Sequence, residues 1–219
     1  MTAAVDNRLS RVRSVRAELH AAGPKRRRPS EGDFERVALP ETDGDVLRDI
    51  LIAHGAHVVI EVGLAYGSSA LAIGEALCST GGTKVSHIVI DPFQATAYDS
   101  VGLDALNAAE LAAQTTFIEE ASSIALARLT GDGFTADAAF VDGSHRFHEV
   151  FVDLYFLRKL VRPGGLIILD DAAWPSVATA LRYFDLNLAW HPVSIGGRLT
   201  ARRLPDEPFE PVFTDFKPF

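Results

Sequence analysis

Three aspartates follow two apolar segments of this sequence, and these residues have the clearest potential for chemistry. Asp142 comes directly after the apolar run 138–141, and Asp170 and Asp171 come directly after the run 166–169. If both runs are neighbouring parallel strands, their carboxyl ends bring the carboxylates to one edge of the sheet, where open α/β sheets bind ligands. Like charges repel one another, whereas carboxylate oxygens are ligands that Mg²⁺ prefers. We therefore expect all three aspartates to bind Mg²⁺ or another divalent cation.

The three aspartates need not all be metal ligands, because adjacent residues of a regular strand point to opposite faces. Both Asp170 and Asp171 can bind a cation only if the chain turns at this point; otherwise Asp171 caps the next element. His145, shortly after the first aspartate, is the expected general base, since an imidazole with a pKa of ~6.5 can accept a proton from a hydroxyl. His148 is the alternative base. Trp174 is expected either to wall the substrate site or to join the core.

A glycine loop is the other stretch that predicts a ligand site. Residues 58–76 read VVIEVGLAYGSSALAIGEA, which is typical of a buried strand, a tight loop and the start of a helix. Gly63 and Gly67 allow backbone N–H groups and the positive end of the helix to approach an anionic ligand. The middle glycine of a dinucleotide fingerprint and the lysine of a phosphate loop are missing, so a different nucleotide-like ligand is favoured over an ordinary turn.

This loop resembles motif I of the class I S-adenosylmethionine-dependent methyltransferases. The motif consists of an acidic residue, a glycine, three variable residues and a second glycine, and Glu61, Gly63 and Gly67 match it. Asp91 ends the next apolar run, where a carboxylate can accept hydrogen bonds from both ribose hydroxyls or form a turn with the following proline. The resemblance places Ser122 beside the adenine, although it is equally suited to cap a helix. The expected cofactor-binding residues are Glu61, Gly63, Gly67, Ser69, Asp91, Ser122 and Asp142.

The spacing of the aspartates narrows the resemblance. Asp142 followed 28 residues later by Asp170 and Asp171 is similar to the metal-dependent O-methyltransferases, both the catechol type and the type acting on sugar hydroxyls of natural products. Asp171 stands where the catechol type has Asn, and His145 stands where it has Lys; the sugar type has a His base there. The resemblance implies an α/β, Rossmann-like methyltransferase fold with a seven-stranded, mostly parallel sheet flanked by helices.

The expected function is Mg²⁺-dependent O-methylation of a hydroxyl on a small metabolite, with S-adenosylmethionine as the methyl donor. Aligning the acceptor oxygen for in-line attack can lower the barrier by ~7–11 kcal/mol, and a bound cation lowers the pKa of a coordinated hydroxyl. The alternatives are metal-independent methylation with His145 acting alone, and a catalytically silent adenosyl-binding module. The Asn-Pro-Pro-aromatic motif of base amino methylation does not occur in the sequence.

Charge divides the chain into a basic arm, residues 1–30, and an acidic methyltransferase domain, residues 31–219. The net charge is −8, yet residues 1–28 contain eight basic and two acidic residues. We expect an amphipathic helix at residues 5–21 that packs in a homodimer rather than on nucleic acid. A single cysteine excludes a disulfide framework, and no apolar run approaches the ~20 residues of a membrane span. A cytoplasmic enzyme without membrane contact is therefore expected.

The sequence also predicts the elements that connect these motifs. Helices are expected at 45–54, 66–78, 103–113, 124–129 and 148–160, a strand at 166–171, and two strands within 188–204 joined at Gly196 and Gly197.

Overall fold

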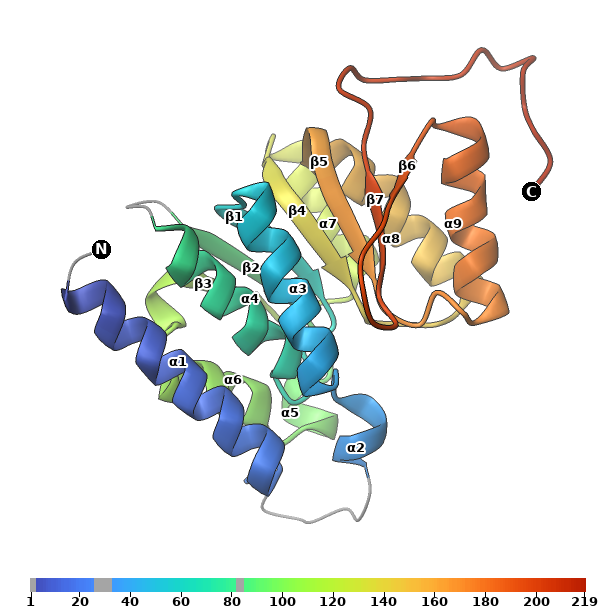
Figure 1. The fold of residues 1–219 in the computed structure, drawn as a ribbon. Coiled ribbons are helices and arrows are strands. Elements are labelled where there is room, and N and C mark those ends of the chain that lie inside the picture. The colour runs from blue at the N-terminus through green and yellow to red at the C-terminus, as the bar shows by residue number, and fades with distance from the viewer. Residues whose placement is uncertain (1–2, 26–32, 82–84) are drawn as a thin grey trace.

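The computed structural model describes residues 3–25, 33–81 and 85–219 of the 219-residue chain. In these residues a seven-stranded sheet has the order β3-β2-β1-β4-β5-β7-β6, with helices on both faces (Figure 1). Pairing is parallel except that β7 runs antiparallel to β5 and β6. The predicted seven-stranded, mostly parallel α/β fold is therefore confirmed. The strands are β1 Val58–Val62, β2 Ser86–Ile90, β3 Thr115–Ile118, β4 Ala136–Val141, β5 Val161–Leu169, β6 His191–Val193 and β7 Thr200–Arg203.

The central strands form because their apolar residues alternate between two helix layers. Ile60 belongs to the core with residues of α7, α8 and α9, whereas its neighbour Val59 belongs to the core with residues of α3 and α4. The helices are α1 Ala3–Ala22, α2 Phe34–Val37, α3 Glu41–His54, α4 Ser68–Thr80, α5 Gln94–Ala97, α6 Val101–Ala108, α7 Ser122–Gly131, α8 Phe147–Leu160 and α9 Pro175–Asn187, and Ala112–Gln114 form a 3-10 turn.

Two predicted elements end earlier than the sequence indicated. The helix predicted at 103–113 is α6, which stops at residue 108 because Glu110 has a left-handed backbone (φ 58°) and the chain turns to bury Leu111. The strand predicted at 166–171 is β5, which begins earlier and ends before both aspartates. Asp171 has φ 52°, so the chain turns at the point where the predicted metal site requires a turn.

The basic arm forms α1, which lies along α4 and α6 (Figure 1). Its apolar face contributes Leu9, Val12 and Leu19 to a third core with residues of α4 and α6. Residues 26–28 of the basic arm lie outside the described residues.

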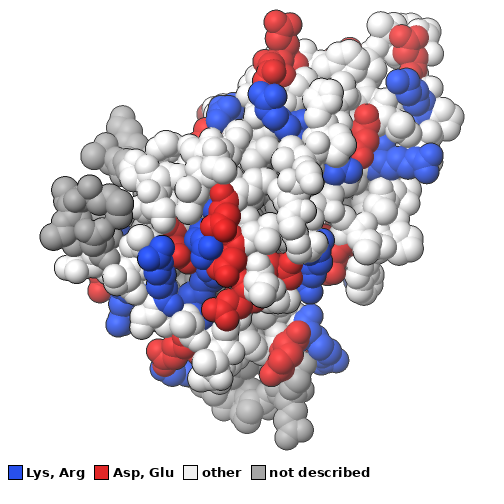
Figure 2. Space-filling view, viewed as in Figure 1, with Lys and Arg blue, Asp and Glu red and all other residues white. Residues whose placement is uncertain are grey.

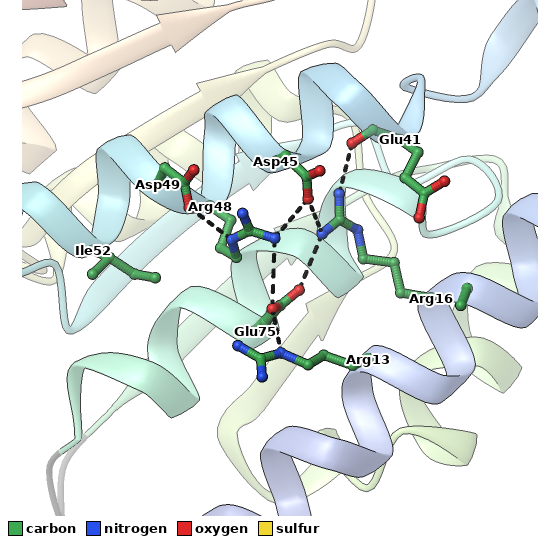
Figure 3. Close-up of a pocket in the computed structure, with 9 residues that line it drawn as sticks. Arg13, Arg16, Glu41, Asp45, Arg48, Asp49, Ile52 and Glu75 are labelled. Carbon is green, nitrogen blue, oxygen red and sulfur yellow. Dashed lines mark hydrogen bonds and ion pairs between the residues drawn. The ribbon is translucent and has the colours of Figure 1, made fainter.

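Basic side chains of α1 meet acidic side chains of α3 and α4, as Figure 2 shows for this face of the molecule. The guanidinium of Arg16 lies 3.0 Å from the Glu75 carboxylate and 2.8 Å from that of Asp45, and its side chain is 5% exposed (Figure 3). Arg13 and Arg48 surround the same carboxylates. The cavity of about 380 Å³ between these helices is thus lined by charges that compensate one another.

Candidate functional site

One cavity of about 830 Å³ lies at the carboxyl ends of the parallel strands. It receives the loops that follow β1, β2, β3, β4 and β5, in accordance with the rule for open α/β sheets. Glu61, Gly67 and Asp170 are not among its lining residues. The predicted residues that do line it are Gly63, Ser69, Asp91, Ser122, Asp142, His145, Asp171 and Trp174.

Asp142, His145 and Asp171 form an acidic cluster at one end of this cavity. One ligand atom from each lies within 4.8 Å of the others. His145 Nε2 is 2.9 Å from Asp171 Oδ2 and 3.9 Å from Asp142 Oδ1. Burial raises the pKa of Asp142 well above its ordinary value, and the charges of Asp170 and Asp171 raise it further. The cluster is therefore a concentration of negative charge that a bound cation would stabilise.

Asp170 does not belong to this three-residue group, although its charge acts on Asp142. Its buried side chain pairs with the guanidinium of Arg198, and its Oδ1 accepts the Asp171 N–H at 2.8 Å. Asp171 has a left-handed backbone, and the next helix has no side-chain cap, so Asp171 does not cap it. The structure thus joins two of the three predicted carboxylates to His145. Sequence reasoning missed Arg198, whose only signal was its place after the Gly196–Gly197 turn.

Trp174 holds the imidazole of His145 from one side. The two rings stack with centroids 5.2 Å apart and planes 27° apart, and Trp174 is 54% exposed at the cavity. This placement matches the predicted wall of a substrate site rather than a core residue. The alternative base, His148, is exposed on α8 and does not line the cavity. Geometry therefore favours His145 as the base.

The glycine loop is fixed by close contacts within the protein. At Gly63 (φ 95°) an added Cβ would lie 2.3 Å from the carbonyl oxygen of Asp142, so this glycine lets the β1 loop approach the β4 loop. Gly67 (φ 85°) begins α4 and packs against Gly102. Residues of the first turn of α4, including Ser69, line the cavity, and the positive end of a helix favours an anionic group such as a carboxylate.

Glu61 stabilises this loop from the protein interior. Its side chain is fully buried, accepts a hydrogen bond from the Ser69 hydroxyl, and lies 2.9 Å from Nε2 of the buried His87. Glu61 therefore orients the start of α4, and Ser69 is the member of this group that lines the cavity.

Asp91 links the end of β2 to the glycine loop. Its Oδ2 accepts the N–H groups of Leu64 at 3.0 Å and Ala65 at 2.9 Å, and its Oδ1 accepts the Phe93 N–H at 2.7 Å. Each carboxylate oxygen has two acceptor positions, so Oδ1 can still accept a ribose hydroxyl. Asp91 thus combines the predicted ligand position with a structural role that the sequence did not indicate.

Two serines and an aspartate also line the cavity. Ser122 begins α7 and lines the cavity, but the helix is preceded by Ala121 and has no side-chain cap, so the predicted capping role is wrong. Ser123 follows it at the cavity wall. Asp153, from the middle of α8, lines the cavity as well, and sequence reasoning did not single it out.

The sheet order, the glycine loop and the acidic end of β2 around one cavity define a class I methyltransferase fold. The sequence model of a family described as a methyltransferase domain matches residues 60–172, more than half of the chain, and the chain belongs to this family.

Relatives of known name agree with that assignment. The chain is 30% identical over 143 residues to a putative caffeoyl-CoA O-methyltransferase of Arabidopsis thaliana, and 31% identical over 182 residues to tricin synthase 2 of Oryza sativa subsp. japonica. The alignments cover 65% and 78% of this chain and 58% of each relative, so the chain spans little more than half the length of either.

A solved structure shows the same fold. The O-methyltransferase TomG from Streptomyces achromogenes, involved in tomaymycin synthesis and solved in complex with SAM, superposes with a TM-score of 0.63 at 19% identity, covering 91% of this chain and 90% of that one. The predicted resemblance to class I S-adenosylmethionine-dependent methyltransferases is therefore confirmed at the level of the family.

Proposed function

We propose that this protein transfers the methyl group of S-adenosylmethionine to a hydroxyl oxygen of a small molecule, with a divalent cation such as Mg²⁺ at the acidic cluster. The observation that carries the proposal is the convergence of Asp142, His145 and Asp171 within 4.8 Å, in the cavity that also contains the glycine loop. The names of the Arabidopsis relative and of TomG support this reading, since both are named as O-methyltransferases.

The residues present fit a cation and the cofactor. The two carboxylates suit a divalent metal, since their mutual repulsion and burial disfavour leaving the negative charge uncompensated, and His145 beside them would act as the base rather than as a ligand. The first turn of α4 would bind the carboxylate of the cofactor, and Asp91 Oδ1 would accept a ribose hydroxyl. When bound, the cation would supply Lewis acidity that lowers the pKa of the acceptor hydroxyl.

His145 would take the proton of the acceptor hydroxyl as the methyl group leaves sulfur and bonds to oxygen. The imidazolium formed in this way is stabilised by the Asp171 carboxylate at 2.9 Å and by the nearby Asp142. Stacking on Trp174 restricts the imidazole to this orientation. A positioned general base typically contributes ~10²–10⁴-fold to the rate.

Metal-independent methylation is the second candidate, and one observation favours it. The guanidinium of Arg198 already neutralises Asp170 at the edge of the cluster. In that case His145, oriented by Asp171, would remove the proton without a metal.

Calorimetry and a methyl-transfer assay separate the two candidates. Catechol and caffeoyl-CoA serve as acceptors, and S-adenosylhomocysteine and Mg²⁺ serve as binding probes. We expect excess EDTA to abolish transfer while binding of S-adenosylhomocysteine persists, and Asp171→Asn to weaken Mg²⁺ binding while the control His148→Ala does not. Full activity in EDTA would assign the metal-independent reaction. A protein that binds no S-adenosylhomocysteine would refute the proposed function.

The homodimer stays a proposal of its own. Two basic residues of the arm that was expected to pack in a dimer, Arg13 and Arg16, pair with acidic residues of α3 and α4 of the same chain. Sedimentation of the full chain tests whether a dimer forms through another surface. In the part of the chain that the structure describes, no helix is long and apolar enough to cross a bilayer.

A further inference from the structure

Arg198 is held in place by two buried carboxylates. Its backbone N–H donates to Asp43 Oδ1 at 2.9 Å, and its guanidinium pairs with the Asp170 side chain. Gly197, with φ 69°, lies so close to the Asp43 carboxylate that an added Cβ would overlap with it. The loop before β7 is therefore anchored on α3, and this anchoring fixes the position from which the Arg198 side chain extends.

The rest of the guanidinium is available to a ligand. Arg198 lines the cavity, and its side chain is 41% exposed. A guanidinium has five N–H donors, and among the described residues its side chain donates to one carboxylate, that of Asp170. The charge of Arg198 is also close enough to act on the Asp142 carboxyl group. Its remaining donors are therefore available beside the acidic cluster, where the acceptor hydroxyl would bind.

Two other arginines line this cavity, and both are more exposed than Arg198. Arg146 follows His145; its side chain is 74% exposed and lies 3.5 Å from the Glu149 carboxylate. The side chain of Arg36 is 76% exposed. Ordering a long, exposed side chain costs entropy and weakens its contact with a ligand. Arg198 is thus the arginine best suited to recognise a group that is fixed beside the cluster.

The balance of charge at the cluster also favours an acidic acceptor. Asp142, Asp170 and Asp171 supply three negative charges there, and Arg198 supplies one positive charge. A divalent cation and the sulfonium of the cofactor would together add three positive charges, which leaves an excess of one. An acceptor with one negative charge removes this excess, and an uncompensated charge in a partly buried site is unfavourable. A planar carboxylate also matches the fork of N–H donors on a guanidinium.

We propose that Arg198 binds a carboxylate of the methyl acceptor and makes the enzyme selective for hydroxy acids, in which the carboxylate lies close to the hydroxyl that receives the methyl group. This inference rests on the proposed function and adds the class of the substrate to it. The reaction itself is unchanged, since the acceptor hydroxyl still loses its proton to His145 as its oxygen bonds to the methyl group.

Matched acids and amides test the class of acceptor. Calorimetry compares 2,3-dihydroxybenzoate with 2,3-dihydroxybenzamide, and glucuronate with glucuronamide, on the wild-type complex with S-adenosylhomocysteine and Mg²⁺. We expect the acid of at least one pair to bind about 10-fold more tightly than its amide, because its hydrogen bonds to Arg198 are charge-assisted. Equal binding of acid and amide in both pairs, or binding of none of the four ligands, would overturn the inference.

Substitutions then show whether Arg198 is the source of the preference. In Arg198→Gln the acid and the amide should bind within about threefold of each other. The matched control Arg146→Gln removes one charge from the same cavity and should keep the wild-type preference. The double variant Asp170→Asn/Arg198→Gln removes the whole ion pair, so the net charge stays that of the wild type, and the preference should again be lost. If circular dichroism shows that Arg198→Gln is unfolded, the double variant, which leaves no unpaired charge, replaces it.

Each contrary result has a distinct meaning. A preference that survives in Arg198→Gln would assign the carboxylate to the cation and overturn the inference. A preference that returns in the double variant would show that Arg198 only shields Asp170, and an equal loss in Arg146→Gln would show a general attraction of anions; either result would also overturn it. Failure of the wild type to bind S-adenosylhomocysteine would instead refute the proposed function.

Discussion

Asp153→Asn should gain stability relative to the wild type as the pH rises from 5 to 8. The pKa of Asp153 is raised from its ordinary value of 3.8 to about 7; burial is the main cause, a hydrogen bond with the Ser122 hydroxyl opposes it, and the Glu149 carboxylate adds to it. The folded protein therefore keeps a proton that the unfolded chain has already released. The stability that protonated Asp153 contributes is fully present below pH 3.8 and is lost as the pH rises through about 7.

The size of this effect follows from the two pKa values. The difference between 3.8 and about 7 corresponds to ~4 kcal/mol of unfolding free energy, which has been lost completely at pH 8. At pH 5 only ~1.5 kcal/mol of this unfolding free energy has been lost. Solvent screens little of it, because the side chain is 1% exposed. An unpaired amide at this position has a cost that does not depend on pH, so a comparison between the two pH values isolates the titration.

Urea unfolding followed by circular dichroism measures the difference. The unfolding free energy of Asp153→Asn minus that of the wild type should increase by ~3 kcal/mol between pH 5 and pH 8. Glu149→Gln is the control, since the pKa of Glu149 is lowered and this group stays ionised over the whole range. A difference that is constant or decreases with pH would show that Asp153 is not a buried acid with a raised pKa.

Three other perturbations follow from the site and its support. His145→Ala should lower turnover by ~10²–10⁴-fold with S-adenosylhomocysteine affinity unchanged; unchanged single-turnover rates would remove it as the base. Gly63→Ala should lower the Tm by far more than Gly81→Ala, because an added Cβ would lie 2.3 Å from a backbone oxygen at the first position and has open space at the second. Arg16→Ala should lower the unfolding free energy by ~3–5 kcal/mol, whereas Arg13→Ala, whose side chain is 59% exposed, should cost at most ~1 kcal/mol. Equal losses in the two arginine variants would contradict the buried pair.

The sequence predicts most of the sheet, and it predicts all three residues of the acidic cluster together with Asp170, which lies outside it. The apolar runs before Asp91, Asp142 and Asp170 locate the strand ends, because parallel strands buried on both faces are apolar throughout. The same apolar pattern does not predict the direction of the side chains that follow a strand. Whether Asp170 joins the cluster depends on the turn at Asp171 and on the guanidinium of Arg198, which comes from a distant loop. Neither feature leaves a local pattern in the sequence.

Asp153 escaped prediction for a related reason. It stands in the apolar run 147–157 of a helix, and periodicity assigns an acidic residue there to a solvated face. Only the packing of α8 on α7 shows that the face in question closes a cavity.

The pairing of Arg198 with Asp170 has a consequence for synthesis of the chain. Ribosomes release the chain from its N-terminus, and β1 to β5 precede the loop between β6 and β7 that contains Arg198. Until that loop emerges, Asp170 follows a buried parallel strand without its counter-ion. A nascent chain that stalls before residue 198 therefore leaves the β5 edge of the sheet unpaired. It also leaves the Asp170 carboxylate, which follows β5, without its counter-ion. The antiparallel β7, which brings the guanidinium into place, covers the same edge in the same event.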